Sequence, residues 1–137
     1  MSQYAEIVND LVNRKTEEEW FEFKENWFDA HGLGEYISAL SNAAALCKRD
    51  KAYLVWGIDD ETHEIVGTKF NFRIDVNKEP LEHYLARQVS PDIAFSFNEM
   101  VFVNKRLVIL EIPCAKNIPT AFDGNRYLRI WSSKVNL

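Results

Sequence analysis

Acidic side chains and a lysine stand at the ends of two short apolar segments of the chain. Glu17 and Glu22 belong to the first segment, which ends at Lys24, and Asp60 follows the second. The residues between the two segments have the spacing of a helix, and the start of a helix can hold an anion. This arrangement predicts a polar site, made of carboxylates, an ammonium group and a helix start, on a mixed core of helices and strands.

Three elements would position this site. Alternation over Trp20–Lys24 predicts a strand in which Glu22 and Lys24 share one face, opposite its phenylalanines. The nearly continuous apolar run Ala52–Ile58 predicts a strand buried on both faces. Between them, apolar residues recur at spacings of three, four and seven, which predicts a helix over Leu33–Cys47.

The remaining pattern alternates between further helices and strands. Helical spacing predicts a first helix over Tyr4–Val12 and a third over Pro80–Val89. Further strands and hairpins are predicted at Asp59–Gly67, Ile93–Phe97, Met100–Leu110 around the turn Asn104-Lys105-Arg106, and Arg126–Trp131. The predicted fold class is α+β, with a mixed, mainly antiparallel sheet flanked by helices.

Length and composition indicate one folded domain over residues 1–137. Apolar residues make up 47% of the chain and aromatic residues 13%, which excludes intrinsic disorder. No apolar run is long enough to cross a bilayer, and the first residues lack a signal-peptide pattern, so we expect a cytoplasmic protein with no membrane partner. Cys47 and Cys114 have no CxxC or Cys/His neighbourhood, so we expect both to be reduced and buried.

The charge is unevenly distributed. The net charge is −5, which argues against tight, nonspecific binding to a phosphate backbone. However, residues 1–100 carry ten Lys and Arg against nineteen Asp and Glu, whereas residues 101–137 carry six against two. A local basic surface is therefore compatible with the sequence, and so is a scatter of solvated charges.

Several motifs, taken in order, resemble the Schlafen AlbA-like domain family from about Thr16 to Ser133. They include Glu-x4-Glu-Phe-Lys ending at Lys24, Ile-Ser-Ala-Leu-Ser-Asn ending at Asn42, Gly57-Ile58-Asp59-Asp60, Ser90-Pro91 and Tyr127-Leu128-Arg129. The family is described as DNA-binding and occurs at the N-terminus of RecG-helicase-related and transcriptional-regulator-like bacterial proteins. The resemblance implies a nucleic-acid-binding module that is the N-terminal part of a longer protein, with the C-terminal domain of that protein as a partner.

The resemblance also implies a catalytic alternative. Some Schlafen members cleave structured RNA with acidic residues at positions that correspond to Glu17, Glu22 and Asp60. A metal-dependent nuclease of this kind would hold Mg²⁺ or Mn²⁺ on these carboxylates and place Lys24 beside the scissile phosphate. The structural alternative is that these acids only form salt bridges at strand ends.

A noncatalytic binding module is the preferred hypothesis. Its DNA or RNA contacts would come from basic residues, with aromatic rings at Phe122, Tyr127 and Trp131 available for base stacking. The basic candidates are Lys48, Arg49, Lys105, Arg106, Arg126 and Arg129. For each of them, a solvated surface position or packing on an aromatic ring is equally compatible with the sequence.

A third hypothesis is an interaction domain that forms homo-oligomers, which gel filtration at several concentrations would test.

The sequence lacks the motifs of several other kinds of enzyme and metal site. The chain has no GxxxxGK[ST] loop, no Gly-x-Ser-x-Gly elbow, and no Cys or His at zinc-ligand spacing from its three histidines. An enzyme other than a nuclease is therefore not predicted.

Overall fold

The computed structural model describes residues 3–130 and 133–137. Helices in this part of the chain are α1 (Gln3–Val12), α2 (Ala30–Leu46) and α3 (Leu81–Ala86). The strands are β1 (Phe21–Lys24), β2 (Lys51–Trp56), β3 (Asp75–Val76), β4 (Glu79–Pro80), β5 (Val89–Ser90), β6 (Ser96–Phe102), β7 (Lys105–Pro113), β8 (Ala121–Phe122), β9 (Asn125–Ile130) and β10 (Ser133–Asn136).

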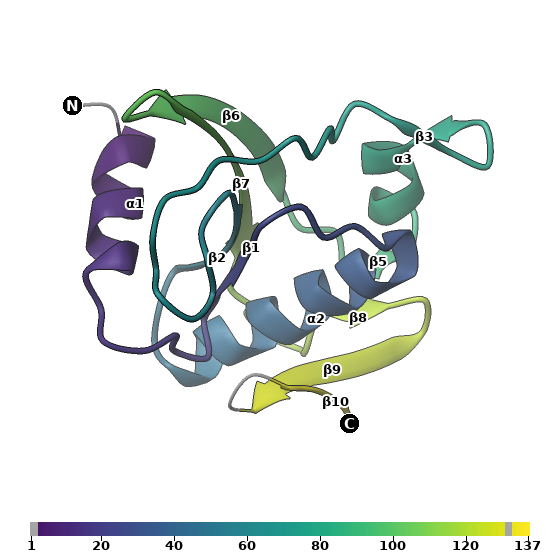
Figure 1. Ribbon diagram of the computed structural model, residues 1–137. Helices are drawn as coiled ribbons and strands as arrows, with labels where there is room; N and C mark the ends of the chain where they lie inside the picture. Colours follow the sequence, from purple (N-terminus) through teal and green to yellow (C-terminus); the bar gives the residue numbers. More distant parts are fainter. Residues whose placement is uncertain (1–2, 131–132) are drawn as a thin grey trace.

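The main sheet has the strand order β1-β2-β7-β6. β1 and β2 run parallel because α2 connects them, whereas the other neighbours are antiparallel. In Figure 1, α1 lies against one side of this sheet and α2 against the other. The side chains of β1 therefore meet protein on both faces, and Phe21, Glu22 and Phe23 are all buried.

A second sheet, with the order β10-β9-β8-β5, covers the opposite side of α2 (Figure 1). The helix is thus enclosed between two sheets, which explains why polar as well as apolar residues of α2 are buried. An added Cβ at Gly34 would lie 2.1 Å from the Phe122 ring, so only glycine allows β8 to approach this closely. The predicted apolar stripe of α2 accounts for only one of its two buried faces.

The polar residues Ser38, Ser41 and Asn42 of α2, which we call the α2 polar latch, all bind Thr120. Ser38 and Asn42 also bind the backbone of Tyr127 in β9, and Ser41 donates to the carbonyl oxygen of Pro113 at the end of β7. Asn42 Nδ2 donates to the carbonyl oxygens of Thr120 (3.0 Å) and Tyr127 (2.7 Å), and Asn42 Oδ1 accepts from Thr120 N at 2.7 Å. Ser38 Oγ donates to Thr120 O and accepts from Tyr127 N. These bonds satisfy polar groups that the fold removes from water.

The α+β class and its mixed, mainly antiparallel sheet are confirmed, as are the helices predicted at the N-terminus and between the first two strands. Three local predictions need correction. The expected hairpin at Asp59–Gly67 is formed only in part: Ile58 and Ile65 make one antiparallel bridge, and Asp59 N and Val66 N donate to the carbonyl oxygens of Glu64 and Gly57, but the returning arm is not a strand. The helix predicted over Pro80–Val89 is shorter, since Val89 instead pairs with Phe122. Another strand, β10, follows the one predicted to be last.

The two cysteines are less buried than we expected. Cys47 is exposed, and Cys114 is half-buried, so neither thiol is in the core; both are free. No helix within residues 3–130 and 133–137 combines the length and apolar character needed to cross a membrane.

Candidate functional site

Glu17 and Glu22 meet at a buried arginine, and we call these two acids and Arg129 the Arg129 cluster. Arg129 Nη2 lies 2.9 Å from Glu17 Oε1 and 3.0 Å from Glu22 Oε1, and its Nη1 donates to the carbonyl oxygen of Glu18 at 2.6 Å. The arginine side chain is completely buried, and the Glu17 and Glu22 side chains are 12% and 5% exposed. The cluster therefore ties β9 to β1 and to the loop before it.

Local structure explains why the two acids converge. Glu22 lies on the face of β1 opposite Phe21 and Phe23, as alternation predicted. Glu17 belongs to the preceding loop, which folds back so that Glu17 Oε2 accepts a hydrogen bond from Phe23 N at 3.2 Å. The two carboxylates then share one guanidinium group, which carries a single positive charge.

This charge imbalance favours the retention of one proton. Burial, followed by the charge of Glu22 and a hydrogen bond with it, raises the pKa of Glu17 to about 8, although the Phe23 amide and Arg129 act in the opposite direction. The raised pKa of Glu17 favours its protonated form near neutral pH, which reduces the negative charge that is buried beside Arg129.

The donor set does not fit a divalent metal. Among the described residues, no three His, Cys, Asp or Glu side chains lie close enough together to hold a metal ion. Asp60 is exposed in the turn after β2, where the preceding Asp59 accepts hydrogen bonds from the amides of Glu61 and Thr62. The predicted site of Glu17, Glu22 and Asp60 for Mg²⁺ or Mn²⁺ is thus not formed, because two of its carboxylates are directed at Arg129.

Lys24 lies among aromatic rings and is half-buried. Its Nζ is 5.1 Å from the centroid of the Trp27 ring and 5.2 Å from that of Tyr36, and Lys134 Nζ lies 4.3 Å from the Tyr36 ring. Burial and then the charge of Glu22 raise the pKa of Tyr36, and Lys24 opposes this shift. The predicted catalytic lysine therefore has a place in the packing between β1 and α2.

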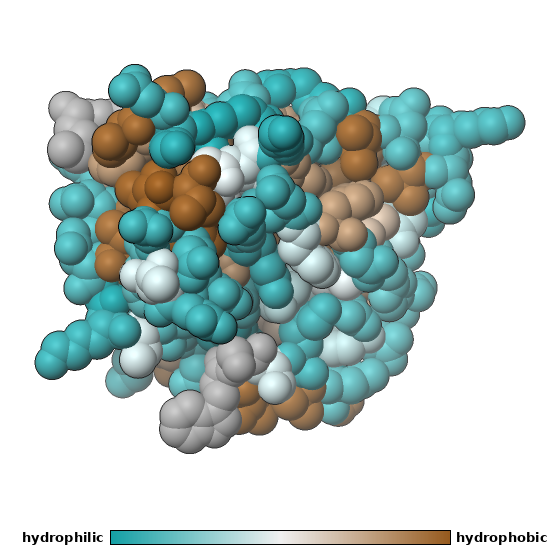
Figure 2. All heavy atoms as spheres, viewed as in Figure 1, coloured by the Kyte–Doolittle hydropathy of each residue, from teal (hydrophilic) through white to brown (hydrophobic). Residues whose placement is uncertain are grey.

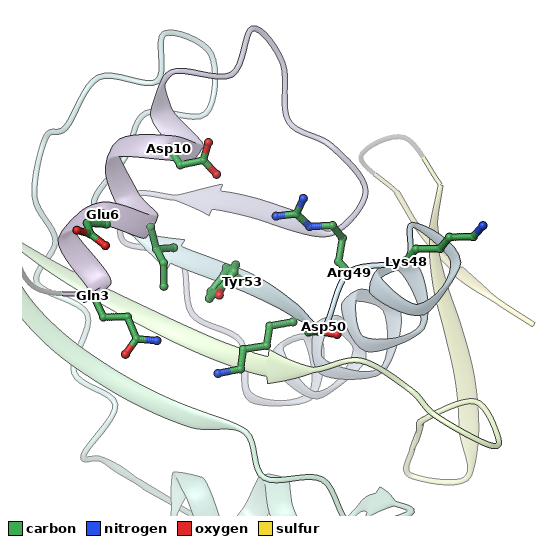
Figure 3. A pocket seen from close by; sticks show the side chains of 9 residues that line it. Gln3, Glu6, Asp10, Lys48, Arg49, Asp50 and Tyr53 are labelled. Atoms are coloured by element: carbon green, nitrogen blue, oxygen red, sulfur yellow. The ribbon is translucent and has the colours of Figure 1, made fainter.

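The predicted basic residues do not form one surface. Lys48 and Arg49 lie in the turn after α2, at the edge of a polar cleft of about 590 Å³. Figure 3 shows Glu6 and Asp10 projecting from α1 into this region, while Lys48 points away from them. Arg49 stacks over Trp20, with 3.9 Å from its guanidinium carbon to the ring centroid. Because the cleft mixes acids and bases, it has no excess of positive charge.

Lys105 and Arg106 begin β7, at the opposite end of the main sheet. Pro113 at the end of β7 pairs with Lys51, next to the Lys48–Arg49 turn. At about 3.3 Å per residue, the eight steps from Lys105 to Pro113 separate the two basic places by roughly 25 Å.

At this end, Lys105 and Lys69 line a groove of about 320 Å³, which we call the Lys69–Lys105 groove. Both lysines are exposed, and neither pairs with an acidic side chain in the part of the chain that the structure describes. Asn26 and Asn104 also line the groove, as does one acid, Glu25.

Arg106 supports this groove. Its Nη1 donates to the carbonyl oxygens of Thr68 (3.1 Å) and Phe70 (2.7 Å), and its Nε lies 2.6 Å from a carboxylate oxygen of Glu99. These bonds hold the segment that carries Lys69 against β7. The guanidinium group of Arg106 is therefore hydrogen-bonded to protein groups, and its role at the groove is to position Lys69.

The basic and aromatic residues predicted in the C-terminal strand have different environments. Arg126 is exposed on β9 and belongs to the second sheet, whereas Lys105 of the groove belongs to the main sheet. Arg129 was predicted to contact phosphate, but it is buried in its ion pairs. Phe122 and Tyr127 are buried, so the prediction that they stack on bases was wrong, and Trp131 lies outside the described residues.

Sequence reasoning missed two groove neighbours that come directly after β1. Asn26 Oδ1 accepts hydrogen bonds from Thr68 Oγ1 and from Lys69 N, so it connects the end of β1 to the segment with Lys69. Phe28 is 38% exposed, which is unusual for a large ring next to a strand. The signal available in the sequence was the aromatic pair Trp27-Phe28 shortly after the predicted strand, although its exposure is visible only in the structure.

The comparisons with known proteins agree with this architecture. The family model described as "Schlafen, AlbA_2" matches residues 17–137, which is most of the chain. The chain belongs to the Schlafen AlbA_2 family. The match includes every member of the Arg129 cluster and both lysines of the groove. No curated protein matches the chain.

Two solved structures resemble this Schlafen AlbA_2 chain in fold. The DIP2311 protein from Corynebacterium diphtheriae has a TM-score of 0.62 at 16% identity, and the alignment covers 95% of this chain but only 25% of that protein. The second is the N-terminal domain of the "Putative ATP-dependent DNA Helicase RecG-related Protein" from Nitrosomonas europaea. It has a TM-score of 0.53 at 21% identity, with 97% of this chain and 92% of that domain covered.

Proposed function

We propose that this Schlafen AlbA_2 domain binds nucleic acid through the Lys69–Lys105 groove. The observation that carries the proposal is the convergence of these two lysines, 36 positions apart in the sequence, on one groove without an acidic partner among the described residues. Lysines free of ion pairs can contact phosphates and release their counterions. The amides of Asn26 and Asn104 add polar groups along the same path.

The binding should be modest and sensitive to salt. The chain as a whole has a net charge of −5, and Glu25 lies at the groove, so attraction at long range is weak. Affinity would come from a few phosphate contacts. We therefore expect the observed affinity to fall steeply as salt is added.

We infer that this domain is the nucleic-acid-binding part of a longer RecG-helicase-related or transcriptional-regulator protein. The chain spans a quarter of the length of DIP2311, and the name of the Nitrosomonas europaea protein refers to a DNA helicase. Both observations support the proposal at the level of the fold. The C-terminal domain of such a protein would be its partner, and the helicase or regulatory activity would belong to that longer protein.

The proposal is tested by fluorescence anisotropy with labelled single-stranded DNA, duplex DNA and hairpin RNA, each with and without Mn²⁺. The double variant Lys69→Glu/Lys105→Glu should weaken binding by about ten-fold or more, which corresponds to about 1.4 kcal/mol. The matched control is Lys48→Glu/Lys116→Glu, which changes the charge equally at exposed sites outside the groove.

The control double variant should bind within about two-fold of the wild type. Equal weakening by both double variants, or no weakening by the groove variant, would refute the proposed surface. Gel analysis of the same samples detects cleavage, and gel filtration tests the predicted oligomerisation.

A further inference from the structure

A stack of three aromatic rings ends at the protein surface next to the groove. The Trp56 ring is fully buried and stacks on Phe70, with centroids 4.3 Å apart and planes at 18°. Phe70 in turn stacks on Phe28, at 5.6 Å and 27°. Phe28 is 38% exposed, whereas Phe70 is 6% exposed, so Phe28 is the outer ring of the stack. The outer ring of the stack is thus partly exposed to solvent and is backed by two buried rings.

The outer ring borders a hollow of about 410 Å³ that adjoins the Lys69–Lys105 groove. The hollow is lined by Asn26, Phe28, Lys69, Phe70, Asn71 and Ile74, and it shares Asn26 and Lys69 with the groove. Figure 2 shows hydrophobic atoms at the surface beside α3, surrounded by hydrophilic ones. An apolar floor and a polar rim therefore lie beside a basic path.

The side-chain amides of Asn26 and Asn71 at the rim are oriented by hydrogen bonds to their oxygen atoms, and their NH₂ groups remain available as donors. Asn26 Oδ1 accepts from Thr68 Oγ1 (3.0 Å) and Lys69 N (2.8 Å), and Asn71 Oδ1 accepts from Arg73 N at 2.9 Å. Within the described residues, neither amide nitrogen donates a hydrogen bond to another group. Each can donate to a ring nitrogen or carbonyl oxygen at the edge of a nucleobase.

We propose that this hollow takes an unstacked nucleobase on Phe28, so that the ligand of the domain is a single-stranded nucleic acid. The inference rests on the proposed function, because the phosphates beside that base would lie on Lys69 and Lys105. A base inside a duplex has both faces covered by its neighbours, whereas a single strand can offer one face to an aromatic ring. The charge and the donors of the rim match a nucleotide better than an apolar protein segment.

The test compares three ligands with the wild-type domain at low salt, by fluorescence anisotropy. They are a labelled single-stranded DNA, the blunt duplex of the same sequence, and a single strand of equal length made of abasic nucleotides. The normal single strand should bind about ten-fold more tightly than the abasic strand, because only the normal strand can stack. This comparison needs no variant.

A variant and its control test whether the preference for a normal over an abasic single strand arises in the hollow. Phe28→Ala should weaken binding of the normal strand by about ten-fold and leave duplex and abasic binding within about two-fold. The control Leu46→Ala removes a more exposed apolar side chain, 69% exposed, outside the hollow and should change nothing. Circular dichroism and urea unfolding confirm that both variants are folded.

The outcomes separate this inference from the proposed function. If Lys105→Glu weakens all three ligands but wild-type affinities for them are equal, the nucleic-acid proposal holds and the base hollow is refuted. If no ligand binds, both proposals fail. If Phe28→Ala leaves binding intact but changes the oligomeric state in gel filtration, the exposed ring belongs to a protein interface and this inference is overturned.

Discussion

The Arg129 cluster and the Lys69–Lys105 groove place charged residues in opposite situations. In the cluster, a completely buried arginine is held by two carboxylates and a backbone carbonyl. In the groove, two exposed lysines lie on a hollowed surface without an acidic partner among the described residues. Both places combine strand ends with loops, and both match the family model.

The difference shows that residue type alone does not identify a binding site. A buried charge has its energy determined by the protein groups around it, and removing one partner leaves the others uncompensated. An exposed lysine contributes little to stability, and its charge remains available to a ligand. Mutations should therefore divide into those that change folding and those that change binding.

The largest effect is expected for Arg129→Met. The change leaves Glu17 and Glu22 buried without their common cation, so the free energy of unfolding should fall by about 3–5 kcal/mol. Urea denaturation at neutral pH measures this quantity. Arg126→Met on the same strand is the control and should cost less than about 0.5 kcal/mol, since Arg126 is exposed. A loss below 1 kcal/mol for Arg129→Met would contradict the structural role of the cluster.

The next effect is a pH dependence that Glu17→Gln should remove. With the pKa of Glu17 raised from 4.5 to about 8, folded Glu17 keeps a proton that unfolded Glu17 loses. Its contribution to stability is complete below pH 4.5 and is lost as the pH rises towards 8. We expect the variant to gain on the order of 3 kcal/mol relative to wild type between pH 5 and pH 8.5, at about 1.4 kcal/mol per pKa unit.

Urea titrations of both proteins at several pH values test this prediction. The difference between the two proteins isolates Glu17 from the other titrating groups. A constant difference across this range would show that Glu17 is ionised in the folded protein.

A smaller effect is expected for Arg106→Met. Arg106 lines the groove, but like Arg129 it is bonded to backbone carbonyl groups. Loss of its hydrogen bonds to Thr68 O and Phe70 O should cost about 1–2 kcal/mol and loosen the segment that carries Lys69. Glu99→Gln removes the exposed ion pairs of Glu99 with Arg106 and Arg73 and should cost less than 1 kcal/mol. Equal losses for the two variants in urea denaturation would mean that the ion pair, and not the backbone contacts, supports the groove.

The smallest change in stability is expected for Lys69→Ala and Lys105→Ala, each within about 0.5 kcal/mol of wild type. Each should nevertheless lower the slope of log K against log salt for nucleic-acid binding by about one, because one phosphate contact is lost. Anisotropy titrations at four salt concentrations measure the slope. A destabilisation above 1 kcal/mol would place these lysines with the Arg129 cluster and not with a free surface.

Elements whose contacts are close in sequence could be predicted well. Alternation located β1 and correctly placed Glu22 opposite Phe21 and Phe23, and helical spacing located α2. The β6–β7 hairpin was also predicted, although its turn is at Val103 and Asn104 and Lys105 already belongs to the strand. Local periodicity is sufficient for such elements.

The burial of Arg129 and the second buried face of α2 could not be predicted in the same way. Ser38 and Asn42 look like exposed positions of an amphipathic helix until β9 is placed over them. Arg129 lies in a strand with no sign that it meets Glu17, more than one hundred positions earlier. Only the tertiary structure distinguishes a paired arginine from one that can reach a phosphate.

The α2 polar latch has a consequence for the order of events during synthesis. Its partners at Thr120 and Tyr127 lie 78 to 89 positions after the latch residues. α2 ends at Leu46 and β9 begins only at Asn125, so one side of the helix stays uncovered in the nascent chain until the last part of the domain has been synthesised. A stop codon or a translational pause shortly before β8 would leave this side open to water and chaperones, while the parallel pair β1 and β2 could already have formed.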